Sequence, residues 1–246
     1  MAKAKRKTAF VCGDCGGEHT KWQGQCTVCQ AWNTLTQINI TPITASGAAA
    51  SLGYAGSTPE IKKLADVEAA ENSRIPSGFG ELDRVLGGGF VPGSMVLIGG
   101  EPGAGKSTLL LQTCTQLALN KKVLYVTGEE SLQQLALRAK RLNLPMDGLH
   151  VASETRAEIV ASHIETLVPD VVILDSVQVM HIDGIDSTPG SVTQVRETAA
   201  YFTRLAKLKS IVIVLVGHVT KEGGLAGPKV LEHMIDCFMM LDSPAG

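Results

Sequence analysis

The residues from Gly100 to Ser107 read Gly-Glu-Pro-Gly-Ala-Gly-Lys-Ser, a spacing that fits a phosphate-binding loop at each position of the motif. Glycines let the backbone turn its N–H groups toward a ligand, and the start of a following helix adds partial positive charge. Lys106 would reach the β- and γ-phosphates, and the Ser107 hydroxyl would be a ligand of Mg²⁺. The sequence therefore predicts a site for ATP, formed by Gly100, Glu101, Pro102, Gly103, Ala104, Gly105, Lys106, Ser107 and Thr108.

Two carboxylates follow apolar runs that are typical of buried strands. Asp175 ends the run Val-Val-Ile-Leu-Asp, and we predict it as the second Mg²⁺ ligand because the loop needs an acidic partner on a neighbouring strand. The alternative is an aspartate that only caps a helix. Glu129 is predicted to orient and deprotonate the attacking water, with Glu130 as the second choice. The alternative for this pair is that both cap the helix expected to begin near Ser131.

A third polar residue follows an apolar run further along the chain. His218 comes after the run at 211–216 and would lie near the γ-phosphate, where it would report the presence of that phosphate to the following loop. The alternative is a histidine held by an ordinary hydrogen bond. With Glu129 and Lys106, His218 completes the predicted catalytic set.

Four of the six cysteines form two Cys-x2-Cys pairs near the start of the chain, separated by ten residues. Two such pairs joined by a short loop bring four thiolates into a tetrahedron around one Zn²⁺, and so short a segment would need the metal in order to fold. Two disulfides, a redox pair and a rubredoxin-like iron site are the alternatives. The predicted zinc ligands are Cys12, Cys15, Cys26 and Cys29.

Other residues around these cysteines have simpler expected roles. His19 is predicted to be a surface residue, because four sulfurs already complete the coordination. Trp22 and Trp32 are the only tryptophans of the chain, and we expect them to pack over the metal, with base stacking as the alternative. Cys114 and Cys237 are expected to be small core residues.

From the strand before the phosphate loop onward, apolar strands alternate with helical patterns. Continuous Val/Ile/Leu runs between amphipathic helices predict an α/β fold with a mainly parallel sheet covered by helices on both faces. The expected strands are 95–98, 123–127, 149–152, 171–174 and 211–216, and the expected helices are 108–119, 132–142, 157–167 and 193–209.

The composition divides the chain into three segments. Residues 1–36 are the cysteine module, 37–58 a linker of small uncharged residues, and 59–246 the α/β domain. With 44% hydrophobic and 19% charged residues, the chain has the composition of a folded protein. No apolar run is long enough to span a membrane and the N-terminus has no secretory signal, so we expect a cytoplasmic protein without a membrane partner.

Several motifs together resemble one family, the bacterial RadA (also called Sms) proteins, which are RecA-like ATPases of recombinational repair. The similarity extends over essentially the whole chain. Besides the phosphate loop and the two cysteine pairs, it rests on Lys21-Trp22-x-Gly24-x-Cys26, Leu82-Asp83-x-x-Leu86-Gly-Gly-Gly89, Gly128-Glu-Glu-Ser131 and Gly217-His-Val-Thr-Lys-Glu-Gly223.

The resemblance implies a RecA-like P-loop NTPase core after a zinc-ribbon-like module. It implies a DNA-dependent, helicase-like ATPase that forms a homohexamer, translocates on single-stranded DNA, and drives branch migration and strand exchange on branched DNA with the RecA recombinase. By family order, Asp183–Gly190 and Lys221–Gly227 would be the two DNA-facing loops, and Lys221 and Lys229 are the predicted DNA contacts.

The family pattern also continues beyond this chain. It includes a Lys-Asn-Arg-Phe-Gly motif and a domain similar to the Lon protease, so this sequence resembles an N-terminal fragment whose ATPase domain is truncated at its C-terminal end. The missing motif would supply cationic groups at the γ-phosphate, and we therefore expect weak hydrolysis from the fragment. A nucleotide-gated DNA clamp without motor activity and a clock-type signalling ATPase are the alternative functions.

Overall fold

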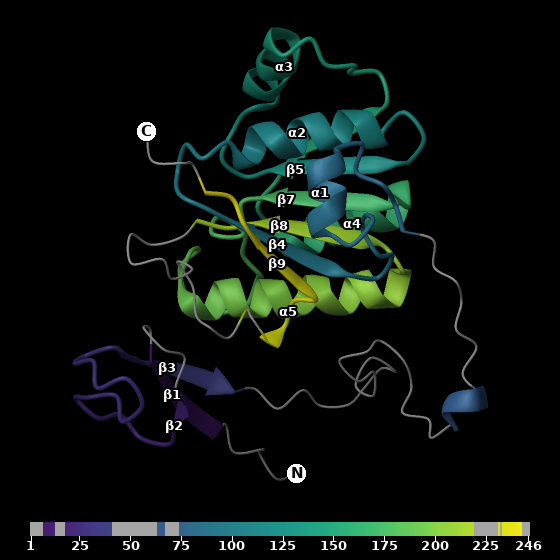
Figure 1. The fold of residues 1–246 in the computed structure, drawn as a ribbon. Helices are drawn as coiled ribbons and strands as arrows, with labels where there is room; N and C mark the ends of the chain where they lie inside the picture. Colours follow the sequence, from purple (N-terminus) through teal and green to yellow (C-terminus); the bar gives the residue numbers. More distant parts are fainter. Residues whose placement is uncertain are drawn as a thin grey trace.

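The computed structural model describes residues 7–12, 18–40, 63–66, 74–218, 231 and 233–242. Its largest element is a six-stranded sheet with the order β6-β5-β7-β8-β4-β9, in which every neighbouring pair of strands is parallel (Figure 1). The strands are β4 (Met95–Gly99), β5 (Val123–Thr127), β6 (Leu149–Ser153), β7 (Val171–Asp175), β8 (Val212–Val216) and β9 (Cys237–Met240).

Helices cover both faces of this sheet (Figure 1). Helices α1, α2 and α3 pack on one face, and α4 and α5 pack on the other. No helix in the described part of the chain combines the length and the apolar character needed to cross a membrane. The helices are α1 (Gly80–Val85), α2 (Lys106–Leu117), α3 (Leu132–Arg141), α4 (Ala157–Leu167) and α5 (Val192–Lys209).

Because helices cover both faces of the sheet, the sequences of its central strands are apolar without interruption. Successive side chains of a strand point to opposite faces. In β7, Val171 and Ile173 belong to the core under α2, whereas Val172 and Leu174 belong to the core under α4 and α5. Both sets are fully buried, so neither face tolerates polar residues. The predicted fold class is confirmed.

Three differences from the expected elements bear on the arrangement of the site. Helix α2 begins at Lys106, two positions earlier than expected. Strand β9 was not expected, although Cys237–Met240 is a continuous apolar run; it lies at the sheet edge, and only Met239 of its residues is buried. Strand β8 lies between β7 and β4, so Asp175 and the phosphate loop are not on directly neighbouring strands.

The N-terminal module is a small antiparallel sheet with the order β2-β1-β3. Its strands are β1 (Lys7–Cys12), β2 (Glu18–His19) and β3 (Leu35–Ile40). Because β3 continues to Ile40, the module extends past the boundary predicted at residue 36, and residues 37–40 belong to a strand rather than to the predicted linker. The rest of that linker lies outside the described residues. A short 3-10 helix, η1 (Leu64–Asp66), is described after it.

Candidate functional site

The phosphate loop joins the carboxyl end of β4 to the first turn of α2. Gly105 is the N-cap of α2 and has φ +91°, a left-handed conformation that favours glycine. No side chain caps this helix, and a glycine cap leaves the N–H groups of the first turn available to an anion. The local backbone is therefore arranged as a phosphate site requires.

Lys106 is the first residue of α2 and is buried, with 5% of its surface exposed. Its Nζ donates hydrogen bonds to the carbonyl oxygens of Gly100 at 2.7 Å and Glu101 at 2.8 Å. Burial lowers the pKa of Lys106, and the negative charges of Asp175 and Glu129 oppose this effect. The ammonium and both carboxylates thus lie close enough to interact electrostatically.

Asp175 ends β7 and is also buried, with 9% of its surface exposed. The hydroxyl of Tyr125 donates to its Oδ2 at 2.6 Å. Within the described residues, this is the only hydrogen bond of the Asp175 carboxylate, and the Ser107 hydroxyl makes none. A carboxylate oxygen and a hydroxyl with no protein partner fit a Mg²⁺ ion, which prefers oxygen ligands.

Glu129 follows the carboxyl end of β5 and lies against residues of two other strand ends. Ser176 Oγ donates to Glu129 Oε1, and His218 Nε2 lies 3.4 Å from the same oxygen. The Glu129 side chain is 43% exposed, so water can reach it. The preceding Gly128 fixes the chain here, because a Cβ at that position would lie 2.3 Å from a methyl group of Val179.

The structure separates Glu130 from this cluster. Glu130 forms an ion pair with Arg138 of α3. Ser131 is the N-cap of α3: its hydroxyl accepts from the Gln134 backbone, and the Gln134 side chain accepts from the Ser131 backbone. Helix α3 is therefore capped without either glutamate, and Glu129 is the glutamate that the geometry places beside Lys106 and Asp175.

Two residues of this cluster were missed by sequence reasoning. Ser176 follows Asp175 directly, and its position after a strand-ending carboxylate was the available signal. Tyr125 lies inside an apolar strand run, where nothing in the local pattern distinguishes it from a core residue. The predicted DNA contacts Lys221 and Lys229 lie outside the described residues, as does the loop at 219–230.

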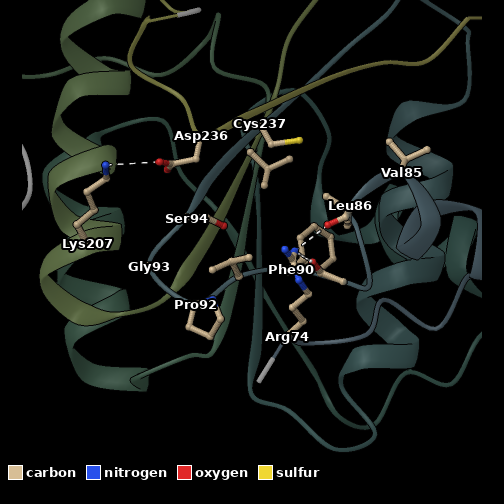
Figure 2. A pocket seen from close by; sticks show the side chains of 13 residues that line it. Arg74, Val85, Leu86, Phe90, Pro92, Gly93, Ser94, Lys207, Asp236 and Cys237 are labelled. Carbon is tan, nitrogen blue, oxygen red and sulfur yellow. Dashed lines mark hydrogen bonds and ion pairs between the residues drawn. The ribbon is translucent and has the colours of Figure 1, made fainter. Parts of the chain in front are cut away.

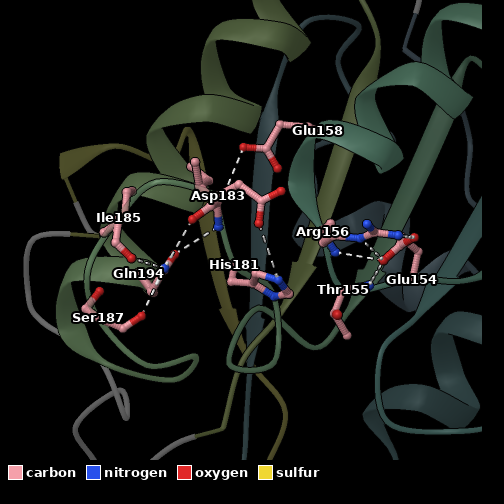
Figure 3. Close-up of polar contacts among 10 residues, drawn as sticks. Glu154, Thr155, Arg156, Glu158, His181, Asp183, Ile185, Ser187 and Gln194 are labelled. Carbon is pink, nitrogen blue, oxygen red and sulfur yellow. Dashed lines mark hydrogen bonds and ion pairs between the residues drawn. The ribbon is translucent and has the colours of Figure 1, made fainter.

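The first predicted DNA-facing loop, Asp183–Gly190, lies within the described residues. The side-chain amide of one buried residue, Gln194, forms hydrogen bonds with its backbone and with Ile182 just before it (Figure 3). Gln194 of α5 accepts from the Ile182 backbone N–H, and its Nε2 donates to the carbonyls of Ile182, Ile185 and Ser187. The loop carries aspartates but no lysine or arginine. Its own side chains therefore offer no cation to a phosphate.

In the N-terminal module the structure brings Cys12, Cys26 and Cys29 together, with their sulfur atoms all within 4.8 Å of one another. The Sγ atoms of Cys12 and Cys29 are 3.6 Å apart. Tetrahedral zinc with Zn–S bonds of about 2.3 Å requires sulfur separations of about 3.8 Å, so the three thiols fit the ion. The fourth predicted ligand, Cys15, lies outside the described residues.

The surroundings of these sulfurs correct two expectations. His19 is not simply a surface residue: its Nε2 lies 3.4 Å from Cys26 Sγ, and Gln23 Nε2 lies 2.9 Å from its Nδ1. Groups that bond to ligand atoms orient them. Trp22 and Trp32 are 58% and 69% exposed, and neither belongs to the module's core. More than half of the surface of each tryptophan is therefore open to solvent, which differs from the expected packing over the metal.

Metal analysis of the purified protein is expected to give one zinc per chain, and Cys26→Ser is expected to lose it, because a lost thiolate breaks the tetrahedron. Cys237→Ser is the matched control, since Cys237 lies on β9 rather than in the cysteine cluster. Both tryptophans lie in this module, so their fluorescence reports its unfolding when a chelator removes the metal. Iron in place of zinc, or retention of metal by Cys26→Ser, would contradict the assignment.

A separate cavity of about 510 Å³ lies at the amino ends of β4 and β9 (Figure 2). Ser94, Asp236 and Cys237 line it, and Lys207 of α5 pairs with Asp236 at 3.5 Å. Parallel strands place these ends opposite to the edge that carries the phosphate loop. This cavity is therefore not part of the predicted nucleotide site.

The chain matches two family models and a group of curated proteins. The model described as "AAA domain" matches residues 59–224, and the model described as "Rubredoxin metal binding domain" matches residues 10–37. The DNA repair protein RadA of Haemophilus influenzae is 56% identical over 246 residues, covering 100% of this chain and 54% of that protein. The RadA protein of Escherichia coli is 56% identical over 249 residues, with the same coverage.

A more distant relative gives the same result. The DNA repair protein RadA of Bacillus subtilis is 46% identical over 240 residues, covering 97% of this chain and 52% of that protein. The chain spans about half the length of the curated relatives it matches. It belongs to the family of AAA-domain proteins and is homologous, along essentially all of its residues, to the bacterial RadA proteins.

Proposed function

We propose that this protein hydrolyses ATP and uses the energy to move on DNA during recombinational repair. The observation that carries the ATPase part is the convergence of Lys106, Asp175 and Glu129 at the carboxyl edge of one parallel sheet. Ligands of open α/β sheets bind outside this edge. The arrangement combines a phosphate-binding cation, a metal-binding carboxylate and a base that water can reach.

The chemistry assigned to each residue follows from its position. The uncapped first turn of α2 and Lys106 would hold the β- and γ-phosphates. Ser107 and Asp175 would hold Mg²⁺, which supplies positive charge to the γ-phosphate as negative charge develops there. Glu129 would orient the attacking water and accept its proton. The hydroxyl of Ser176 fixes the carboxylate of Glu129 for this role.

His218 is proposed to couple the nucleotide to the following loop. It is the residue after Gly217 at the end of β8, and its Nε2 touches Glu129. A change in charge or position of Glu129 on hydrolysis would therefore act directly on His218. The residues that follow His218 include both lysines proposed as DNA contacts, Lys221 and Lys229.

The DNA part of the proposal rests on the relatives, which are named DNA repair proteins. We propose single-stranded and branched DNA as the polymer, branch migration and extension of strand exchange as the outcome, and the RecA recombinase as partner. A homohexamer in the cytoplasm is the proposed assembly. The acidic character of Asp183–Gly190 favours Lys221 and Lys229 as the phosphate contacts.

The test is ATP turnover with and without single-stranded DNA, measured at several salt concentrations. We expect DNA to raise turnover several-fold at low salt and less at high salt, because phosphate contacts weaken as salt increases. Lys221→Ala with Lys229→Ala should reduce the stimulation without changing DNA-free turnover. If ATP turnover is the same with and without DNA at every salt concentration, the protein is not a motor of the proposed kind.

A nucleotide-gated clamp is separated from a motor by a second assay. With a forked duplex and ATP, a motor of the proposed type displaces one strand, whereas a clamp binds the fork and displaces none. The same assay on one of the curated relatives provides the comparison, because those proteins are about twice the length of this chain.

A further inference from the structure

The hydroxyl of Tyr125 forms a buried hydrogen bond with Asp175 that has no role in the chemistry proposed above. It lies on β5, which pairs with β7, and its backbone register partner is Ile173, two residues before Asp175. Its side chain is fully buried on the α2 face of the sheet. From there the phenol hydroxyl reaches forward to Oδ2 of Asp175 at 2.6 Å.

This hydrogen bond belongs to a strong class. A hydroxyl that donates to a carboxylate at 2.5–2.7 Å forms a charge-assisted bond, about twice as strong as a neutral one. Burial, and then the charge of Asp175, raise the pKa of Tyr125 well above its ordinary value. The phenol therefore remains protonated and acts as a donor throughout the physiological range.

The bond also makes the two carboxylate oxygens of Asp175 different, because only Oδ2 accepts from Tyr125. Oδ2 is held by Tyr125, and within the described chain no protein group bonds to Oδ1. A carboxylate held at one oxygen cannot rotate freely about its Cβ–Cγ bond. The group that fixes one oxygen therefore also fixes the direction of the other.

We propose that Tyr125 is the positioning residue of the magnesium carboxylate, holding Oδ2 of Asp175 so that Oδ1 is presented to the metal. This inference rests on the proposed role of Asp175 as a Mg²⁺ ligand. It assigns a specific task to a residue that otherwise looks like an ordinary core aromatic. The competing explanation is that Tyr125 only fills the core and that its hydroxyl takes the nearest acceptor.

The test is the Mg²⁺ dependence of nucleotide binding in Tyr125→Phe. The purified protein is titrated with a fluorescent ATP analogue, first in EDTA and then at increasing MgCl₂ concentrations. Removing a group that orients a metal ligand costs metal affinity by about tenfold or more. We therefore expect the half-saturating Mg²⁺ concentration to rise by about tenfold, while the dissociation constant in EDTA stays unchanged.

Tyr201→Phe is the matched control. Tyr201 lies on α5, on the other face of the sheet, where its ring packs edge-on against Phe202. Loss of its hydroxyl should leave the Mg²⁺ titration as in the parent protein. Thermal unfolding of both variants shows whether either substitution disturbs the fold.

A purely structural role for Tyr125 predicts different results. An unchanged Mg²⁺ titration in Tyr125→Phe, or equal weakening of binding with and without Mg²⁺, would overturn the inference. In the Asp175→Ala background, Tyr125→Phe should have no further effect on the Mg²⁺ response, because the positioned group is absent. An additional loss in that background would also overturn it.

Asp175→Ala alone separates this inference from the function on which it rests. If Asp175→Ala abolishes the Mg²⁺ response but Tyr125→Phe leaves it intact, the positioning role is wrong and the proposed metal ligand stands. If Asp175→Ala leaves the Mg²⁺ response intact, the proposed metal ligand and the positioning role are both wrong.

Discussion

The Glu129→Gln variant is expected to lose ATP turnover by a factor of about 10²–10⁴, the usual contribution of a positioned general base. Glutamine has the shape of glutamate and keeps an oxygen that can accept from Ser176 and His218, the two groups that contact Oε1 of Glu129. It cannot take a proton from water. The affinity for ATP should therefore remain, because Lys106 and the phosphate loop are untouched.

Glu130→Gln is the matched comparison. Glu130 is next to Glu129 in the sequence but pairs with Arg138 on α3. Its substitution should lower stability through the loss of that ion pair and leave turnover within a few-fold of the parent protein. Steady-state hydrolysis and equilibrium binding of a fluorescent ATP analogue measure both effects. The opposite order, with Glu130→Gln inactive and Glu129→Gln active, would exchange the two assignments.

Lys106→Ala is expected to lose both binding and turnover, with turnover reduced by about 10²–10³ through the missing electrostatic stabilisation alone. The ammonium is buried and directed at the loop by two carbonyl contacts. Alanine leaves the carboxylates of Asp175 and Glu129 without their nearby cation. Their negative charge would then repel the phosphates of ATP.

Lys121→Ala is a control on the same segment of chain. Lys121 follows α2 and is exposed, away from the phosphate loop, so its loss should change neither binding nor turnover. Binding and hydrolysis are measured as for Glu129→Gln. Turnover in Lys106→Ala within tenfold of the parent protein would mean that Lys106 does not act on the γ-phosphate.

The parts that could be predicted from the sequence are those that local spacing determines. The phosphate loop is one continuous segment, and each buried strand is a short apolar run, so Val123–Thr127 and Ala157–Leu167 have the same bounds in the structure as in the prediction. The loop motif and the apolar runs can be recognised in the sequence because each depends only on residues that are close together in the chain. The parallel sheet then follows from the alternation of strands and helices.

The missed parts depend on contacts between distant residues. Tyr125 and Asp175 are 50 positions apart, and Ser176 and Glu129 are 47 apart. Only the strand order brings them together. The edge strand β9 is a short apolar run, but it has none of the valines and isoleucines that mark β7, and its pairing with β4 joins segments about 140 residues apart. The small sheet of the N-terminal module was missed because cysteine spacing indicates a metal site but not the backbone around it.

The position of β8 in the sheet has a mechanical consequence. This strand pairs on one side with β7, which ends in Asp175, and on the other side with β4, which leads into the phosphate loop. Its own carboxyl end continues through Gly217 to His218. If the proposed nucleotide site is correct, a displacement of the chain at His218 would therefore be passed along one strand to the place between the two supports of the nucleotide.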